Sequence, residues 1–237
     1  MKNFIHLLRE ITSPTWLIEK PLNEATKRIL TNTVKDKSRW LDIGCGLKPY
    51  AECFSNANYV GIDIEDSGRP IDMKVPDKFY DGINIPYEDA SFDGVLCTQV
   101  LEHVEDLDKF LVECSRVVKF GGSFIISVPF IYKEHEKPYD FRRFTSFGLI
   151  SDLNRNGFQV LKCQKLISSI ETISMMLCIY VDNNISVKGR LARTLSRLFI
   201  IFPTMILAKL LVKILPDNKD LYFNLLAIAI KKETPQR

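Results

Sequence analysis

Residues 41–46 read Leu-Asp-Ile-Gly-Cys-Gly, the segment most informative about the architecture of the chain. Its first three residues complete the short segment Arg39–Ile43, which is typical of a buried strand. Glycine lets the backbone turn sharply and approach a ligand closely, because it has no Cβ. In an open α/β sheet, ligands bind beyond the carboxyl ends of the strands. The stretch therefore predicts the first strand of such a sheet, a ligand-binding loop and then a helix.

Further strands and helices alternate along the chain after this loop. The short apolar runs predict strands at Tyr59–Ile64, Gly94–Cys97, Ser123–Val128 and Phe223–Ile230. Apolar residues at steps of three and four predict a helix that Asp106 caps and that ends near Val118. A second helix is expected from a cap at Thr145 to Gly157. This alternation is the pattern of a parallel sheet with crossover helices.

The chain divides into three predicted parts. An N-terminal helical segment covers residues 1–38, with a helix start at Ser13-Pro14. The sheet domain covers 39–165 and 221–232, and an apolar, basic, helical insertion covers 166–220. Within the first eleven residues, Phe4, Leu8 and Ile11 predict a short amphipathic helix, and charged residues among them argue against a signal peptide.

Composition excludes several classes of protein. The hydrophobic content of 46% argues against disorder, and a net charge of +3 is too small to indicate nucleic-acid binding. The six cysteines form no Cys-x-x-Cys pair, so neither a zinc site nor a disulfide framework is expected, and no other metal-ligand cluster is visible. Scattered cysteines fit a reducing cytoplasm.

The glycine loop favours a cationic ligand over a dinucleotide. A dinucleotide fingerprint needs a third glycine three residues after Gly46, where this chain has Pro49. The acid Asp42 stands two residues before Gly44 and suits a ligand with positive charge and no phosphate, such as S-adenosylmethionine. The next strand ends at Asp63, where a carboxylate can accept hydrogen bonds from both hydroxyls of a ribose.

Five segments in one order resemble a known family. They are Leu41–Gly46, Gly61–Asp63, Ile85–Tyr87 with Ser91–Asp93, Gln99–His103 and Arg116–Gly122. The series resembles the class I S-adenosylmethionine-dependent methyltransferases of the type 11 group, over roughly residues 38–165. The resemblance implies a Rossmann-like sheet of seven strands, mostly parallel, with an antiparallel last strand.

The resemblance also implies a role for each matching residue of the cofactor site. Asp42, Gly44 and Gly46 match the loop around the methionine part of the cofactor, and Asp63 matches the acid that binds the ribose. The remaining matches lie along the adenine and below the sulfonium. They are Ile64, packing on the adenine; Asp81, facing its amino group, with Gly82 beside it; and Thr98 and Gln99, below the sulfonium. The spacing from Asp66 to Asp81 departs from the family pattern.

A long loop, residues 129–145, supplies the expected acceptor side. Its His-x-x-Pro-x-Asp-x-x-Arg-Phe pattern resembles a subset of the family in which this segment lies over the active site. We predict that His135 is the general base, with His103 as the alternative and otherwise a residue of the substrate site. Tyr139 and Arg143 complete that site. Either Arg142 or Arg143 is expected to pair with a nearby acid, and Arg143 is favoured for an anionic acceptor.

The insertion points to a membrane surface or to another protein surface. Residues 185–215 contain basic residues and no acid, and the uncharged run Leu198–Ala208 is about half the length that spans a bilayer. Pro203 is expected to interrupt it. We predict peripheral contact with an anionic membrane, at its cytoplasmic face, with a helical cap or a homodimer interface as the alternative.

The sequence thus predicts methyl transfer from S-adenosylmethionine to oxygen or nitrogen of a small-molecule, lipid or glycan-precursor acceptor. Nucleic acid is not an expected substrate, because the sheet portion shows no basic stripe. Two alternatives from other classes stay open. One is a cofactor-binding regulator or assembly partner without catalysis. The other is an NAD-linked oxidoreductase, which Pro49 disfavours.

Overall fold

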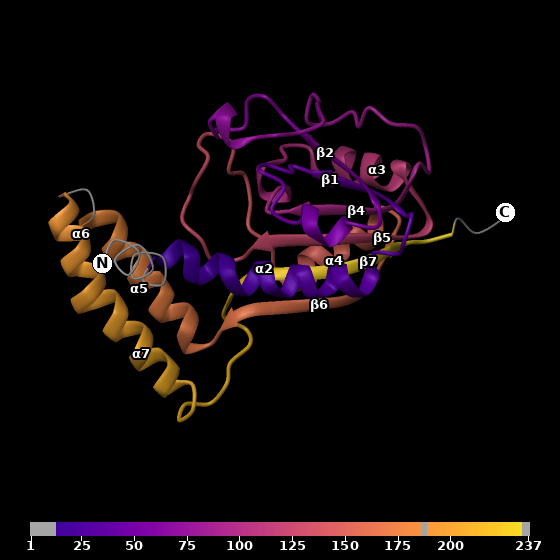
Figure 1. Cartoon of the computed structure of the whole chain (residues 1–237). Coiled ribbons are helices and arrows are strands. Elements are labelled where there is room, and N and C mark those ends of the chain that lie inside the picture. The colour runs from indigo at the N-terminus through magenta and orange to yellow at the C-terminus, as the bar shows by residue number, and fades with distance from the viewer. Residues whose placement is uncertain (1–12, 186–188, 234–237) are drawn as a thin grey trace. The chain divides into compact units, whose positions relative to one another are not determined.

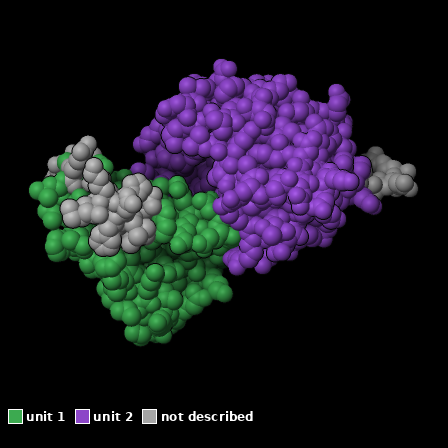
Figure 2. Space-filling view, viewed as in Figure 1, with its two compact units in different colours: residues 1–25, 165–223 green, residues 26–164, 224–237 purple. Residues whose placement is uncertain are grey.

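The computed structural model describes residues 13–185 and 189–233. The chain divides into two compact units, shown in different colours in Figure 2. We call Thr26–Gln164 with Asn224–Arg237 the sheet unit, and Met1–Ala25 with Lys165–Phe223 the helical unit. The predicted N-terminal segment is thus divided between the two units. The insertion, predicted at 166–220, corresponds to residues 165–223. The short helix expected around Phe4 and Leu8 lies outside the described residues.

Seven strands form one sheet in the order β3-β2-β1-β4-β5-β7-β6 (Figure 1). The strands are β1 (Arg39–Ile43), β2 (Asn58–Asp63), β3 (Lys78–Phe79), β4 (Phe92–Thr98), β5 (Val118–Pro129), β6 (Phe158–Ser168) and β7 (Tyr222–Lys231). The pairs β1–β2, β1–β4, β2–β3 and β4–β5 are parallel, and β7 runs antiparallel to β5. The predicted mostly parallel sheet with an antiparallel last strand is confirmed.

Two α-helices of the sheet unit begin where their caps predict. Helix α3 (Leu107–Val117) begins after Asp106, whose carboxylate accepts the backbone N–H of Lys109 at 3.2 Å. Helix α4 (Ser146–Arg155) begins after Thr145, whose hydroxyl accepts the N–H of Gly148 at 3.0 Å. Each cap satisfies one of the N–H groups that have no partner within the helix.

The connection after the glycine loop differs from the prediction. We expected a helix there, and the structure has only the short 3₁₀ helix η1 (Ala51–Phe54). The strand β2 begins at Asn58, so the connection is too short for an α-helix of several turns. Proline at position 49 also lacks the N–H that would continue a helix.

Aromatic side chains fill the core against the sheet. The largest fully buried side chains include Trp40, Phe92, Phe110, Phe124 and Phe158. Gly94 in β4 makes room for Trp40, because a Cβ at this position would lie 2.5 Å from the indole ring. The pairing of Trp40 with Gly94 across β1 and β4 therefore requires glycine in the middle of a strand.

Arg116 at the end of α3 ties the loop before β4 to the helix. Its guanidinium donates to the carboxylate of Glu113 and to the carbonyl oxygens of Ile85 and Tyr87, at 2.7–2.8 Å. It also pairs with Asp89 at 2.8 Å. One side chain therefore satisfies several acceptors that no regular element reaches.

The helical unit contains α5 (Ile170–Ile185), α6 (Arg190–Ser196), the π-helical turn η5 (Arg197–Ile201) and α7 (Phe202–Leu211). The long helix α2 (Pro14–Thr33), which starts at the predicted Ser13-Pro14 position, is divided between the two units. Buried Cys178 and Val181 of α5 pack with Ile201 of η5. Arg197 pairs with Asp182 at 3.0 Å.

The expectation that Pro203 interrupts the apolar run is wrong. The helix continues from α6 through η5 into α7, and Pro203 lies in the first turn of α7. There the N–H of Phe202 bonds the carbonyl of Arg197, a five-residue spacing. The wider π-turn immediately before Pro203 moves the preceding carbonyl groups away from the proline ring, so the continuous helix tolerates it.

Candidate active site

The sheet unit contains a cavity of about 1080 Å³ at the carboxyl ends of β1, β2 and β4. Small-molecule sites commonly measure roughly 300–1,000 Å³, so a nucleoside cofactor and part of an acceptor fit together here. Nine of the residues predicted for the cofactor and substrate sites line it. They are Gly44, Asp63, Ile64, Asp81, Gly82, Gln99, His103, Tyr139 and Arg143.

Asp63 is held in place by the loop that it faces. One carboxylate oxygen accepts the N–H of Gly46 at 2.9 Å, and the other accepts the N–H of Ile64 at 2.8 Å. The side chain is buried and lines the cavity. Each oxygen keeps a lone pair, so both can also accept from the vicinal hydroxyls of a ribose. Gly46 itself does not appear among the lining residues and acts through this bond.

Gly44 brings the chain close to the neighbouring loop. Its φ of +69° lies in the left-handed region, and a Cβ here would lie 2.4 Å from Cγ2 of Val100. Both residues line the cavity. Glycine at position 44 therefore serves the turn and the close approach at once.

Asp42 lies behind the loop, on β1. It is 1% exposed, and one carboxylate oxygen accepts the hydroxyl of Tyr59 while the other has no partner among the described residues. Burial raises the pKa of this carboxyl to about 7, against the lowering effect of the Tyr59 hydrogen bond. Asp42 is absent from the cavity lining, so its predicted contact with the cofactor stays a prediction.

Ile64, Asp81 and Gly82 lie along one wall of the cavity. The carboxylate of Asp81 accepts the N–H groups of Ile83 and Asn84 at 2.9 and 2.7 Å and the side-chain amide of Asn84 at 2.6 Å. These hydrogen bonds keep the pKa of Asp81 below its ordinary value. Asp81 therefore fixes its own turn, and its contact with the adenine stays a prediction.

Thr98 ends β4, and Gln99 follows it with a φ of +54°. The side-chain amide of Gln99 donates to the hydroxyl of Ser127 at 3.1 Å, which ties it to β5. Gln99 lines the cavity and Thr98 does not. Of the two residues predicted at this strand end, Gln99 therefore faces the cavity.

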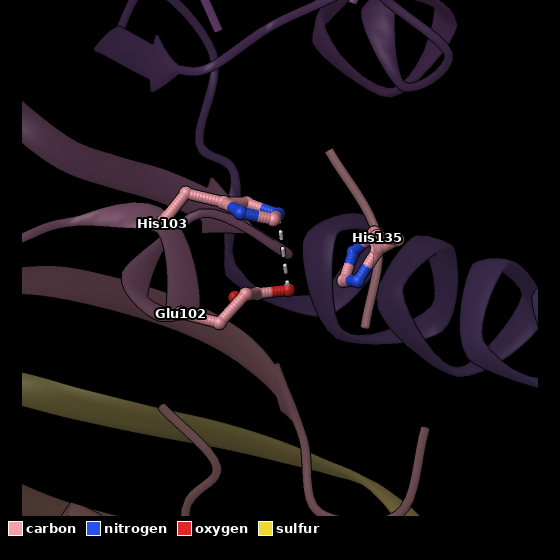
Figure 3. A group of neighbouring side chains, drawn as sticks. All are labelled: Glu102, His103 and His135. Atoms are coloured by element: carbon pink, nitrogen blue, oxygen red, sulfur yellow. Dashed lines mark ion pairs between the residues drawn. The ribbon is translucent and has the colours of Figure 1, made fainter. Parts of the chain in front are cut away.

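Glu102, His103 and His135 form a polar cluster, with their side chains turned toward one another (Figure 3). Of the three, His103 lines the cavity, whereas Glu102 and the predicted base His135 do not. Glu102 and His103 belong to the 3₁₀ helix η3 (Leu101–His103), and the rings of His103 and His135 meet edge to face at 4.7 Å. Burial raises the pKa of Glu102 to about 8. Burial, and then the charge of His103, lower the pKa of His135.

The carboxylate of Asp140 binds both His135 and Arg143 of the acceptor loop, and the second contact changes what we expect of Arg143. Arg143, which we favoured for an anionic acceptor, donates to both carboxylate oxygens of Asp140 and to the carbonyl of Lys133. Burial by itself raises the pKa of Asp140, but the Arg143 and His135 hydrogen bonds outweigh it and hold the pKa well below its ordinary value. The charge of Arg143 is thus already paired, although the residue lines the cavity.

Tyr139 and Arg142 complete the loop. The hydroxyl of Tyr139 donates to Asp66 at 3.2 Å, and its carbonyl faces Nδ1 of His103 at 2.9 Å. Arg142 donates to the carbonyl of Glu105 at 2.8 Å. Tyr139 lines the cavity as predicted for a substrate residue, and its binding role stays a prediction.

Sequence reasoning left Glu102 without a role. The sequence did place Glu102 next to His103 within the motif Gln99–His103, and this position could have indicated a role beside that histidine. Burial of the carboxylate and its nearness to His135 follow only from the folded loop. We expected no cluster of metal-ligating residues, and the fold brings residues 102, 103 and 135 together in a group that could hold an ion. The expectation that the protein binds no metal stays a prediction.

Comparison with known proteins places the chain in a family. A family model described as a methyltransferase domain matches residues 41–126. Norajmaline N-methyltransferase of Rauvolfia serpentina is 31% identical over 107 residues, which are 39% of this chain and 36% of that protein. An uncharacterized protein of Methanocaldococcus jannaschii is 30% identical over 164 residues, which are 64% of this chain and 77% of that protein.

Two further comparisons concern one more relative in sequence and one solved structure that shares the fold. Ubiquinone biosynthesis O-methyltransferase of Saccharophagus degradans is 28% identical over 102 residues, covering 38% of this chain and 43% of that protein. The crystal structure of the [4+2]-cyclase SpnF has a TM-score of 0.57 at 18% identity, covering 90% of this chain and 82% of that chain. The chain spans less than half the length of both named methyltransferases.

The fold and the glycine loop define a Rossmann-like methyltransferase domain. The chain belongs to the class I S-adenosylmethionine-dependent methyltransferases of the type 11 group, as the resemblance predicted. S-adenosylmethionine is therefore its cofactor. The cavity fits this molecule, because it combines the oriented carboxylate of Asp63 with the apolar side chains of Ile64 and Val100.

Proposed function

We propose that the protein transfers the methyl group of S-adenosylmethionine to an oxygen or nitrogen atom of a small-molecule, lipid or glycan-precursor acceptor. One observation carries this proposal: a single cavity holds Asp63 and the glycine loop at one side and His103 at the other. A cofactor bound by Asp63 and an acceptor beside His103 would therefore share one cavity. Such alignment of two reactants supplies much of the rate of a bimolecular transfer.

The chemistry requires alignment and one proton transfer. When bound, the cofactor supplies a methyl group on a sulfonium; the bond from carbon to sulfur breaks, its electron pair stays on sulfur, and the new bond forms to the acceptor atom. A hydroxyl or ammonium acceptor must also lose a proton. His135 is the candidate to take it, because Asp140 faces its Nδ1 at 3.1 Å and leaves Nε2 with a lone pair.

The names of two relatives support an oxygen or nitrogen acceptor. One relative is an N-methyltransferase and the other an O-methyltransferase. Both acceptor types need a group that handles the proton, and the histidine cluster provides it. The paired charge of Arg143 disfavours a strongly anionic acceptor at this position.

Radiolabel transfer tests the proposal. Purified protein is incubated with S-adenosylmethionine carrying a labelled methyl group and with host extract separated into lipid, glycan, protein and small-molecule fractions. Label should appear in the lipid, glycan or small-molecule fraction, and His135→Gln should lower its rate by roughly 10²–10⁴ with cofactor binding retained. Cofactor binding without label in any fraction would instead support a regulator without catalysis.

We also propose that the helical unit binds an anionic membrane surface at the cytoplasmic face. By length and composition, the helix Leu191–Leu211 is long and apolar enough to cross a bilayer, with a mean hydropathy of 1.6. Large apolar side chains on it are exposed, among them Leu191, Phe199, Ile206, Leu207 and Leu210. An apolar face of this kind beside basic residues is typical of helices that bind membrane surfaces.

Charge favours a position on the surface over a position across the bilayer. Arg197, in the middle of the helix, pairs with Asp182 of α5, and charged groups are costly at the centre of a bilayer. Arg193, Lys209 and Lys213 are exposed and suit anionic lipid headgroups. The cytoplasmic leaflet carries such lipids. All six cysteines are free, which agrees with a reducing compartment.

Flotation with vesicles tests this second proposal. Wild-type protein should float with vesicles that contain anionic lipid at low salt, and should be released at high salt, because salt screens the attraction. Replacing Arg193, Lys209 and Lys213 together by Gln should weaken binding by about 1 kcal/mol for each charge. A soluble dimer at low salt would identify the face as an oligomer interface, and resistance to carbonate washing would identify a membrane-spanning helix.

A further inference from the structure

We infer that Glu102, His103 and His135 form a binding site for one divalent transition-metal ion, beside the cavity that His103 lines. Each residue offers one ligand atom, and these atoms all lie within 4.8 Å of one another. Figure 3 shows the carboxylate of Glu102 and both imidazole rings facing a common point. The chain has three histidines, and two of them meet here.

Both histidines are oriented as metal ligands usually are. Nδ1 of His103 lies 2.9 Å from the carbonyl oxygen of Tyr139, and a carbonyl only accepts, so this nitrogen carries the proton. Nδ1 of His135 lies 3.1 Å from a carboxylate oxygen of Asp140. In both rings the lone pair is therefore on Nε2. Metal-bound histidines typically donate their other N–H to a carbonyl or a carboxylate in this way.

Buried groups of the cluster lack the partners that burial demands. Glu102 has no exposed surface, and neither of its carboxylate oxygens has a hydrogen-bond partner within the described part of the chain. Nε2 of His103 is likewise buried and has none there. A buried polar group without a partner costs roughly 1–3 kcal/mol, and a cation between these atoms would satisfy them together.

The donor set selects the class of ion. Two imidazole nitrogens and one carboxylate suit zinc, iron, cobalt or manganese in the divalent state, whereas magnesium and calcium prefer oxygen ligands throughout. Three protein ligands also leave coordination positions for water or for an acceptor. Glu136 borders the site, with a carboxylate oxygen 3.8 Å from Nε2 of His103.

Ligand atoms on one ion lie closer together than these atoms do. Nε2 of His103 is 3.9 Å from a carboxylate oxygen of Glu102, and the widest separation within the group is 4.8 Å. Bond lengths of about 2.0–2.2 Å require all of them within roughly 4 Å. Ion binding would therefore draw the three side chains together, and His135, which is half-buried, has room to move.

The role of the ion rests on the proposed function, although its presence does not. An acceptor hydroxyl bound to a divalent metal loses its proton more readily, because the metal stabilises the oxyanion. In the ion-bound protein, Nε2 of His135 then holds the metal, and the proton leaves to solvent. The site would favour acceptors with a hydroxyl or with adjacent oxygens that coordinate the ion.

Direct metal binding tests the inference. The full chain without an affinity tag, treated with chelator and dialysed, is titrated with Co²⁺ while visible absorption is recorded, and with Zn²⁺ in a calorimeter. We expect saturable binding of one ion with visible ligand-field bands. Glu102→Gln and His135→Gln should weaken binding at least tenfold, whereas His6→Gln, which removes the third histidine, should leave it unchanged.

A supporting variant separates ligation from folding. Asp140→Asn keeps the size of the side chain that orients His135, and such supporting changes typically cost 10–100-fold in metal affinity. Binding of S-adenosylhomocysteine to each variant shows that the domain is intact. Equal Co²⁺ binding by wild type and His135→Gln, or a near-ultraviolet thiolate band, would overturn the site.

Activity then separates the two proposals. Metal binding without methyl transfer to any fraction would refute the proposed function and leave the site standing. Methyl transfer that survives complete removal of metal would refute the metal's role and return His135 to the role of base. Loss on chelation, with recovery on adding Co²⁺ or Zn²⁺, is the result that we expect.

Discussion

Replacing Asp63 by asparagine should break the cofactor site while keeping the fold. In the structure one carboxylate oxygen accepts the N–H of Gly46 at 2.9 Å and the other accepts that of Ile64 at 2.8 Å. Asparagine keeps one acceptor oxygen and loses the charge. Hydrogen bonds to charged groups contribute roughly 1.5–3 kcal/mol each. Losing one charged bond to the ribose therefore predicts at least a tenfold weaker complex, at about 1.4 kcal/mol per factor of ten.

Calorimetry with S-adenosylhomocysteine measures this effect, and Asp77→Asn is the matched control. Asp77 also accepts a backbone N–H, that of Gly61 at 2.7 Å, but it does not line the cavity. Both variants should therefore lose a similar amount of thermal stability, and only Asp63→Asn should lose affinity. Wild-type affinity in Asp63→Asn, or an equal loss in both variants, would refute the assignment of Asp63 to the ribose.

Three further predictions concern stability. The pKa of Asp42 is about 7 in the folded state, against an ordinary value of 3.8, so between these pH values the folded state keeps a proton that the unfolded state loses. The free energy of unfolding should therefore fall by on the order of 4 kcal/mol as the pH rises from 4 to 7. Urea unfolding at several pH values should show a shallower fall for Asp42→Asn; equal slopes would contradict the assignment. Gly44→Val should lower the melting temperature as well as affinity, since its Cβ would lie 2.4 Å from Val100, and an unchanged melting curve would show that the loop adapts. Arg116→Met should cost about 2 kcal/mol in urea unfolding, because it removes the hydrogen bonds to Glu113 and to the carbonyl oxygens of Ile85 and Tyr87; a cost near zero would mean that water replaces the guanidinium.

Local sequence patterns were enough to predict most of the fold. The strand at Arg39–Ile43 and the caps at Asp106 and Thr145 appear where the patterns place them. The strand follows from the periodicity of apolar residues, and each helix start follows from a side chain that accepts the backbone N–H two or three residues further on. Both features depend only on residues that are neighbours in the sequence. The same locality explains the failure at Pro203, because a π-turn depends on hydrogen bonds that a residue pattern does not encode.

The cofactor side was readable because one loop and one strand end carry it. Gly44 and Asp63 are close to one another in sequence, and parallel pairing of β1 with β2 brings them to the same edge. The acceptor side was not readable to the same degree. Arg142 and Arg143 are adjacent and chemically identical, so only the folded loop decides which one holds Asp140.

The class of protein follows from residue patterns alone: the glycine turn, the acid at the second strand and the order of the motifs are all local or nearly local features. What surrounds each side chain depends on how the chain folds. The fold buried Glu102 and brought His135 to His103 across 32 residues of chain, and it turned Asp42 away from the cavity toward Tyr59. The physical reason is that burial, which sets the cost of a polar group and the pKa of a carboxyl, depends on packing between distant segments.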